Sequence, residues 1–228
     1  MIWTRLRDHR TAQRIAAVDD SPFPASGRQR LGNQHPHLSD DDIRQVEAAT
    51  RQWFRLVARH PRATLTMPSV VVHDFWYELT LHTRDYAAFC DAAFGRSLPH
   101  QREPAVAADT ANTNRARVLL ATLGYARRDE GSSPTALPLL FRVDESLRIP
   151  NGNRYLADCG GRGQCFQAPS LICLQHLAGP GKRPGPRGIR GDLPFYDGRH
   201  GHAGGASGGG GVGDFGGDGG GGDGGGGI

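Results

Sequence analysis

Apolar residues recur every three or four positions over much of the first two thirds of the chain, the period of an amphipathic helix. The clearest such stretch follows Ser39, a good N-cap with three acidic residues in the next turn, and Pro61 ends it. A second helix is predicted to start at Ser69. Its β-branched run over residues 70–72 is also compatible with a strand, but helix-spaced apolar residues beyond the run favour a helix.

Three further helices are predicted downstream. One begins near Thr83 and ends at Gly95, which stands where a C-terminal capping glycine belongs. Another is expected from about Asp109 to Arg128, and a short last helix from Pro138 to about Leu147. Because no segment alternates apolar and polar residues over any length, no strand is expected.

Composition changes near Asp158 and divides the chain. Residues 31–158 are predicted to form a small all-α domain of about four to six helices, preceded by a weakly periodic lead-in segment over residues 1–30. Residues 159–228 are a low-complexity, Gly/Pro-rich tail, since 19 of the 33 glycines lie in the last 31 residues. Such a tail buries too little apolar surface to offset its ordering entropy, so we expect it to be disordered.

Charge and hydropathy exclude several classes of protein. The net charge of +4 is spread over both parts of the chain, which disfavours nucleic-acid binding and leaves a protein as the expected partner. No apolar stretch is long enough to cross a membrane, and the first residues lack the apolar core of a secretory signal. A cytoplasmic location is therefore expected, while the sequence indicates no oligomeric state.

A longer motif covers the second predicted helix and the segment after it. It reads M-P-S-V-V-V-H-D-F-W-Y-E-L over residues 67–79, T-R-D-Y-A-A-F-C over 83–90 and F-G-R-S-L-P-H over 94–100. The motif resembles the signature of the glycine-rich domain-containing protein family of bacteria and plants. That family is largely uncharacterised, so the resemblance implies no reaction. The matching positions are Pro68, Ser69, Val72, Trp76, Thr83, Tyr86, Phe89, Cys90, Phe94 and Gly95.

Polar positions of that signature differ in this chain. His73 stands where the family has Asp, Tyr77 where it has His, and Pro99 in place of the first of two paired histidines, which leaves His100. His73 and His100 are the candidate ligands for a zinc or iron ion, because imidazole is a common transition-metal ligand. The alternative is that His73 and Tyr77 form a hydrogen bond or border the core.

Two other groups of side chains have a structural and a functional interpretation. Asp74 and Glu78 are spaced i, i+4 as an acid–base pair would be, but this spacing more often marks a solvated face paired with Arg84 or nearby arginines. The large aromatic side chains are expected to form the core between helices, with a ligand pocket as the alternative. They are Trp53, Phe75, Trp76, Tyr86, Phe89 and Phe94.

A Cys3His set lies beyond the predicted domain boundary. It consists of Cys159, Cys165, Cys173 and His176, with five, seven and two intervening residues. Structural zinc sites usually contain a tight C-x2–4-C pair, which is lacking here, and Gly and Pro interrupt the segment. We interpret these cysteines as thiols without a metal, with zinc as the alternative, and expect Cys90 to be a buried core residue.

No complete set of catalytic residues emerges. The sequence therefore predicts a non-enzymatic interaction or structural module that needs no cofactor. The alternative hypothesis is a metal-dependent enzyme or sensor that uses the His73/His100 region, with a site partly lost in this chain.

Overall fold

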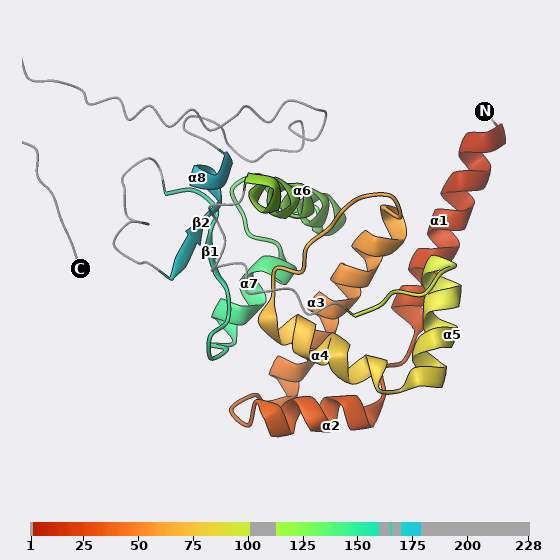
Figure 1. Cartoon of the computed structure of the whole chain (residues 1–228), viewed down its shortest axis with the longest axis horizontal. Coiled ribbons are helices and arrows are strands. Elements are labelled where there is room, and N and C mark those ends of the chain that lie inside the picture. Colours follow the sequence, from red (N-terminus) through yellow and green to blue (C-terminus); the bar gives the residue numbers. More distant parts are fainter. Residues whose placement is uncertain (1, 101–112, 160–164, 166–169, 179–228) are drawn as a thin grey trace, which may run out of the picture. The chain divides into compact units, whose positions relative to one another are not determined.

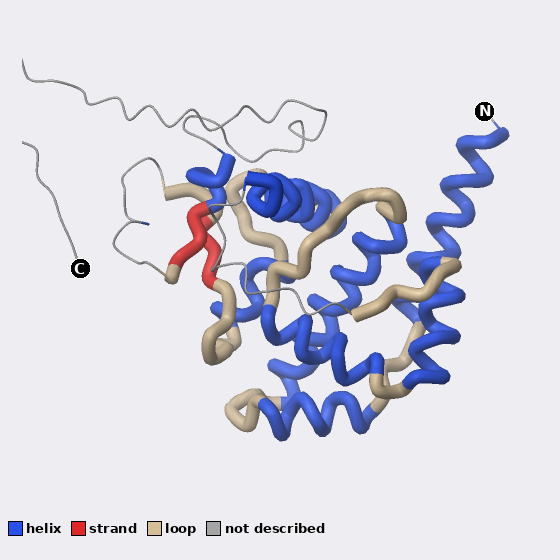
Figure 2. The backbone as a smooth tube through the Cα atoms, viewed as in Figure 1, coloured by secondary structure: helices blue, strands red, loops and turns tan. Residues whose placement is uncertain are grey.

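A computed structural model describes residues 2–100, 113–159, 165 and 170–178. The chain divides into two units, Met1–Tyr196 and Asp197–Ile228, and all described residues belong to the first. The described part is mostly helical, with eight helices and two short strands (Figures 1 and 2). A mostly helical fold is thus confirmed, and five of the described helices lie wholly within residues 31–158, where four to six are expected. Residues 179–228 of the predicted disordered tail and the predicted helix start at Asp109 lie outside the described residues.

The elements follow one another along the chain with short connections at several points. The helices are α1 Ile2–Asp20, α2 Ala25–Gln34, α3 Asp40–Arg59, α4 Val70–Thr80, α5 Thr83–Phe94, α6 Thr113–Glu130, α7 Leu139–Ser146 and α8 Leu174–Ala178. The strands are β1 Arg154–Leu156 and β2 Leu171–Cys173. No helix in these described ranges has both the length and the apolar character needed to cross a bilayer.

Helix α3 lies at the centre of the helical part and packs against α1, α4, α6 and α7 (Figure 1). It begins with the expected cap: the side chain of Ser39 accepts from the backbone N–H of Asp42, and the Asp42 carboxylate accepts from the Ser39 N–H. This reciprocal pair satisfies two donors at the helix start. The helix ends at Arg59, just before Pro61, as predicted.

The run of valines at the start of α4 is helical, not extended. Ser69 caps the helix by accepting a hydrogen bond from the Val72 N–H at 3.2 Å. The buried carboxylate of Asp144 on α7 accepts from the N–H groups of Val70 and Val71, at 2.8 and 3.2 Å. These acceptors satisfy the first N–H groups of the helix, which have no partner inside it.

Helix α5 ends as the sequence predicts. Gly95 follows its last residue with a φ of 65°, in the left-handed region that favours glycine.

Helix α1 is a correction to the lead-in segment expected at the N-terminus. It packs against α3 and α5, and its Val18 side chain is fully buried. The Arg51 guanidinium of α3 donates to the Val18 carbonyl at 2.6 Å and to the Ser21 carbonyl at 2.9 Å. These contacts join residues that are distant in the sequence, so the weak apolar periodicity of α1 does not predict them.

The large aromatic residues form the core, as expected. Trp53, Phe75, Trp76 and Phe94 are buried, and the partly buried Tyr86 and Phe89 pack against them. Cys90 is also buried, with 2 % of its surface exposed.

Two three-residue strands form a parallel pair at the end of the described chain, with Tyr155 opposite Ile172 and Leu156 opposite Cys173. Strands this short cannot show the alternation by which a sequence reveals a strand. The Tyr155 hydroxyl and the Asn153 amide both donate to the Pro68 carbonyl, which attaches β1 to the start of α4. The sequence places a boundary near Asp158, yet β2 and α8 follow that residue, and α8 packs on α6 and β1.

Candidate metal centre

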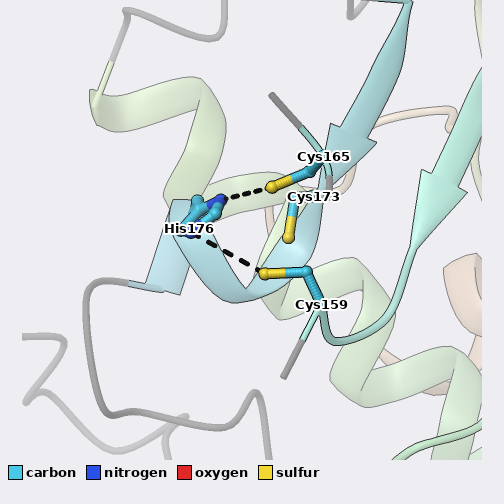
Figure 3. A group of neighbouring side chains, drawn as sticks. All are labelled: Cys159, Cys165, Cys173 and His176. Atoms are coloured by element: carbon cyan, nitrogen blue, oxygen red, sulfur yellow. Dashed lines mark hydrogen bonds between the residues drawn. The ribbon is translucent and has the colours of Figure 1, made fainter. Parts of the chain in front are cut away.

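Four side chains with metal-binding atoms converge beside the strand pair. The ligand atoms of Cys159, Cys165, Cys173 and His176 all lie within 4.8 Å of one another. Figure 3 shows the three sulfur atoms and the imidazole ring of His176 gathered at one spot. Among the described residues, no other group of three or more His, Cys, Asp or Glu side chains brings its ligand atoms this close together.

Strand topology explains how ligands spread over 18 positions meet. Because β1 and β2 are parallel, their carboxyl ends lie at the same edge, and a crossover connection must join them. Cys173 is the last residue of β2, and Cys159 follows the end of β1 by three residues. Cys165 lies in the crossover. Helix α8 begins directly after Cys173, and His176 is on its first turn.

Two close contacts link the His176 ring to cysteine sulfurs. Its Nδ1 lies 3.1 Å from the Cys165 Sγ, and its Nε2 lies 3.8 Å from the Cys159 Sγ (Figure 3). The Gln175 Oε1 accepts from the Cys159 backbone N–H at 3.3 Å and from the Cys159 Sγ at 3.2 Å. The cluster is thus held by a neighbouring amide as well as by its own members.

The sulfur atoms are shielded from water. Cys159, Cys165 and Cys173 expose between 4 % and 7 % of their surface and form a small core of their own, packed against Leu156 and Leu171. Desolvation and the adjacent Cys159 and Cys173 sulfurs raise the pKa of Cys165 to about 11. None of these cysteines, all described, forms a disulfide. Crowded neutral thiols of this kind become thiolates when a cation sits among them.

The donor set and its dimensions fit a zinc ion. Zinc takes thiolate sulfur at about 2.3 Å and imidazole nitrogen at about 2.0–2.1 Å in a tetrahedron, which places neighbouring ligand atoms about 3.8 Å apart or less. The span of 4.8 Å across the four ligand atoms is close to this arrangement. Cys3His is one of the usual ligand sets of structural zinc sites.

The two histidines expected to bind a metal also lie together, on α4 and after α5. The ring centroids of His73 and His100 are 4.2 Å apart, and His100 also contacts Trp76 at 4.9 Å and Tyr77 at 5.5 Å. The pKa of His100 is lowered by burial and by His73. The pair supplies two imidazoles. Among the described residues, no third metal-binding side chain lies as close to them as the members of the cysteine cluster lie to one another.

The expectation of a solvated face for Asp74 and Glu78 is wrong. Glu78 is buried, with 9 % exposure, and forms an ion pair with Arg30 of α2 and not with Arg84. Asp74 is partly buried and lies 3.2 Å from the His35 Nε2. Packing of α2 on α4 covers this face, and a spacing rule for a single helix cannot anticipate such a neighbour.

A family model covers most of the folded part of the chain. The model, described as UCP032817-like, matches residues 13–177. The chain belongs to the UCP032817-like family. This family is uncharacterised, so membership assigns no activity. No curated protein and no solved structure matches the chain.

The UCP032817-like match includes β2 and all four members of the cysteine cluster. The spacing of these four residues is only a weak indication of a zinc site. The closest pair, Cys173 and His176, is one cysteine and one histidine, and the other gaps are long. One feature of the sequence does indicate the cluster: Cys159 and Cys173 each stand at or near the end of a short apolar segment. A parallel pairing of those segments brings the two sulfurs to one edge.

Proposed function

We propose that this protein binds one zinc ion through Cys159, Cys165, Cys173 and His176, and that the ion holds the strand pair and α8 together at the end of the helical part. The observation that carries the proposal is the convergence of four zinc-type ligand atoms within 4.8 Å. Zinc bound there would replace an unfavourable crowd of buried thiols with a neutralised set of thiolates.

Four protein ligands leave no open position for water or substrate. Catalytic zinc sites keep such a position, whereas structural sites are closed. A closed site supports the prediction of a non-enzymatic interaction or structural module, now stabilised by zinc, with another protein as its partner. The resemblance to glycine-rich domain-containing proteins, which have no assigned reaction, agrees with such a role. Thiolate ligands also need a reducing compartment, for which we propose the cytoplasm.

Metal analysis of the purified full chain tests the proposal. We expect one zinc ion per chain in the unmodified protein and loss of zinc in Cys165→Ser and His176→Ala. Cys90→Ala is the matched control, because Cys90 is buried in the hydrophobic core of the helices, which is separate from the small core formed by the three cysteines. It should keep the full zinc content.

The same experiment distinguishes the other candidate site. If the metal were held by His73 and His100, His73→Ala would remove it and Cys165→Ser would not. Stoichiometric iron with visible absorbance would instead indicate an iron–sulfur centre at the cysteines. Folded, metal-free protein that takes up no zinc would contradict the proposal.

A further inference from the structure

A cleft of about 1250 Å³ lies between α1, the loop that follows α3, and α6. One wall is a face of α1, the other is the end of α3 with residues 61–63 of the loop, and Tyr125 of α6 contributes its ring. Pockets for small molecules usually measure about 300–1,000 Å³, so this cleft has room for a longer ligand. It shares none of its lining residues with the cysteine cluster.

The lining of this cleft is rich in arginine. Arg10 and Arg14 are on α1, Arg59 ends α3 and Arg62 follows it, whereas the described lining holds one carboxylate, that of Asp8. Arg59 already forms an ion pair, at 2.5 Å, with a carboxylate of α6 whose side chain is 2 % exposed. Within the residues that the structure describes, the other three arginines form no ion pair. Three guanidinium groups are therefore available to a negatively charged ligand.

The electrostatic field at the cleft is positive. His60 also lines it, and its ring stacks on Tyr125 with ring centroids 3.8 Å apart. Burial lowers the pKa of His60, and the positive charges of Arg128 and Arg59 lower it further, against the opposing effect of one nearby carboxylate. A field that disfavours a protonated imidazole favours an anion at the same place.

Leu6 adds an exposed apolar side chain to the lining. It is 49 % exposed, one of three large hydrophobic side chains exposed to this degree in the described part of the chain. Leu6, Arg10 and Arg14 are spaced four residues apart and so lie along one face of α1. Apolar surface together with unpaired arginines is typical of protein–protein interfaces, in which arginine is enriched.

The spacing of this face of α1 fits an extended peptide. Neighbouring members of the face are about 6 Å apart along the helix, since each residue rises about 1.5 Å. In an extended chain, residues two positions apart point to the same side and are about 6.5 Å apart. Alternate residues of such a peptide can therefore meet Leu6, Arg10 and Arg14 in turn.

We propose that this cleft binds an extended, acidic segment of another protein. Alternate acidic residues of the segment pair with Arg10 and Arg14, and an apolar residue packs on Leu6. Arg62 contacts the segment from the opposite wall. The proposal rests on the proposed role as an interaction module, and it names the surface and the kind of partner.

A nucleic acid fits this cleft less well than an acidic peptide. Proteins that bind single strands use aromatic rings on which bases stack, and the Tyr125 ring already stacks on His60. The net charge of +4 is also spread over both parts of the chain, which gives no strong basic field for a phosphate backbone.

Titration of a fluorescently labelled, amidated peptide with the zinc-loaded, full-length chain tests the proposal by fluorescence anisotropy. The peptide G-L-S-E-S-E-S-L-G reads the same in both directions, so the test does not depend on its orientation in the cleft. We expect saturable binding that weakens as salt concentration rises, because salt screens exposed ion pairs. The matched peptide G-L-S-Q-S-Q-S-L-G, which lacks acidic side chains, should bind about tenfold more weakly.

Variants of the chain locate the binding surface. Arg10→Gln and Arg62→Gln should each weaken binding of the acidic peptide about threefold, and the double variant about tenfold, as expected for exposed ion pairs. Arg84→Gln is the matched control, because it removes an exposed arginine of α5 that does not line the cleft. It should leave the affinity for the acidic peptide unchanged.

Three results would overturn the proposal: no saturable binding, equal affinity for the two peptides, or equal weakening by Arg84→Gln and the cleft variants. Displacement of the peptide by a lower concentration of single-stranded oligonucleotide would also overturn it, in favour of a nucleic-acid partner. Zinc content is measured on the same samples. A failure of peptide binding by zinc-loaded protein therefore refutes this surface and leaves the metal site unaffected, whereas zinc-free protein contradicts the metal site whatever the peptide does.

Discussion

The buried carboxylate of Asp144 connects the helical part to the strand that leads into the cysteine cluster. It accepts hydrogen bonds from the Ser69 hydroxyl at 2.6 Å and from the N–H groups of Val70, Val71 and Asn153 at 2.8, 3.2 and 2.8 Å. Asp144 is 2 % exposed, so water does not replace it readily. Replacing it with alanine removes the acceptor that both α4 and the start of β1 share.

The size of the effect follows from the donors left behind. The N–H groups of Val71 and Asn153 are in buried hydrogen bonds. A buried donor without an acceptor costs about 1–3 kcal/mol, so Asp144→Ala should lower the free energy of unfolding by about 2–6 kcal/mol. Since a domain is stable by only about 5–15 kcal/mol, this is a large part of the total. Asp144→Asn keeps one carbonyl oxygen and should cost less.

Urea denaturation of the zinc-loaded protein measures these differences through the transition midpoint. Glu145→Ala is the matched control, because Glu145 is the next residue of α7 and forms an exposed ion pair with Arg154 at 3.1 Å. Exposed pairs contribute less than about 1 kcal/mol. If Asp144→Ala were no more destabilising than Glu145→Ala, the role assigned to this carboxylate would be refuted.

Three further predictions concern the metal site, a turn and acid stability. Gln175→Ala should weaken zinc binding about 10–100-fold in competition with a chromophoric chelator, because outer contacts orient metal ligands, and unchanged affinity would argue against that contact. Gly95→Ala should destabilise the protein by about 1 kcal/mol or more in urea, because its φ is 65°, and a gain in stability would contradict this. The lowered pKa of His60 means that the unfolded chain takes up a proton before the folded one as pH falls below about 6.5. Stability should therefore decline between pH 7 and pH 5, and His60→Gln should reduce that decline.

Local sequence signals predict the helical elements well where the cause is local. Ser39 and Ser69 cap α3 and α4, and Gly95 ends α5, because capping depends on side chains within a few residues of the helix end. The strands β1 and β2 escape prediction because three residues carry no period, and their pairing depends on contacts 17 positions apart. The burial of Glu78 depends in the same way on α2, a distant partner.

The candidate site shows the same division. Proximity of His73 and His100 was accessible from their shared motif, since one lies on α4 and the other soon after α5. The cysteine cluster was not, because its four ligands come from a loop, a crossover, a strand and a helix. Spacing rules for zinc sites describe ligands in tight turns. In this protein the parallel pairing of β1 and β2 brings the ligands together instead.

The most direct measurement is X-ray absorption at the zinc edge on the purified full-length protein. Binding by Cys159, Cys165, Cys173 and His176 predicts a shell of three sulfur atoms at about 2.3 Å and one nitrogen atom at about 2.0–2.1 Å around a single zinc ion. A shell of nitrogen and oxygen atoms only, or a protein that is folded and contains no zinc, would contradict the account.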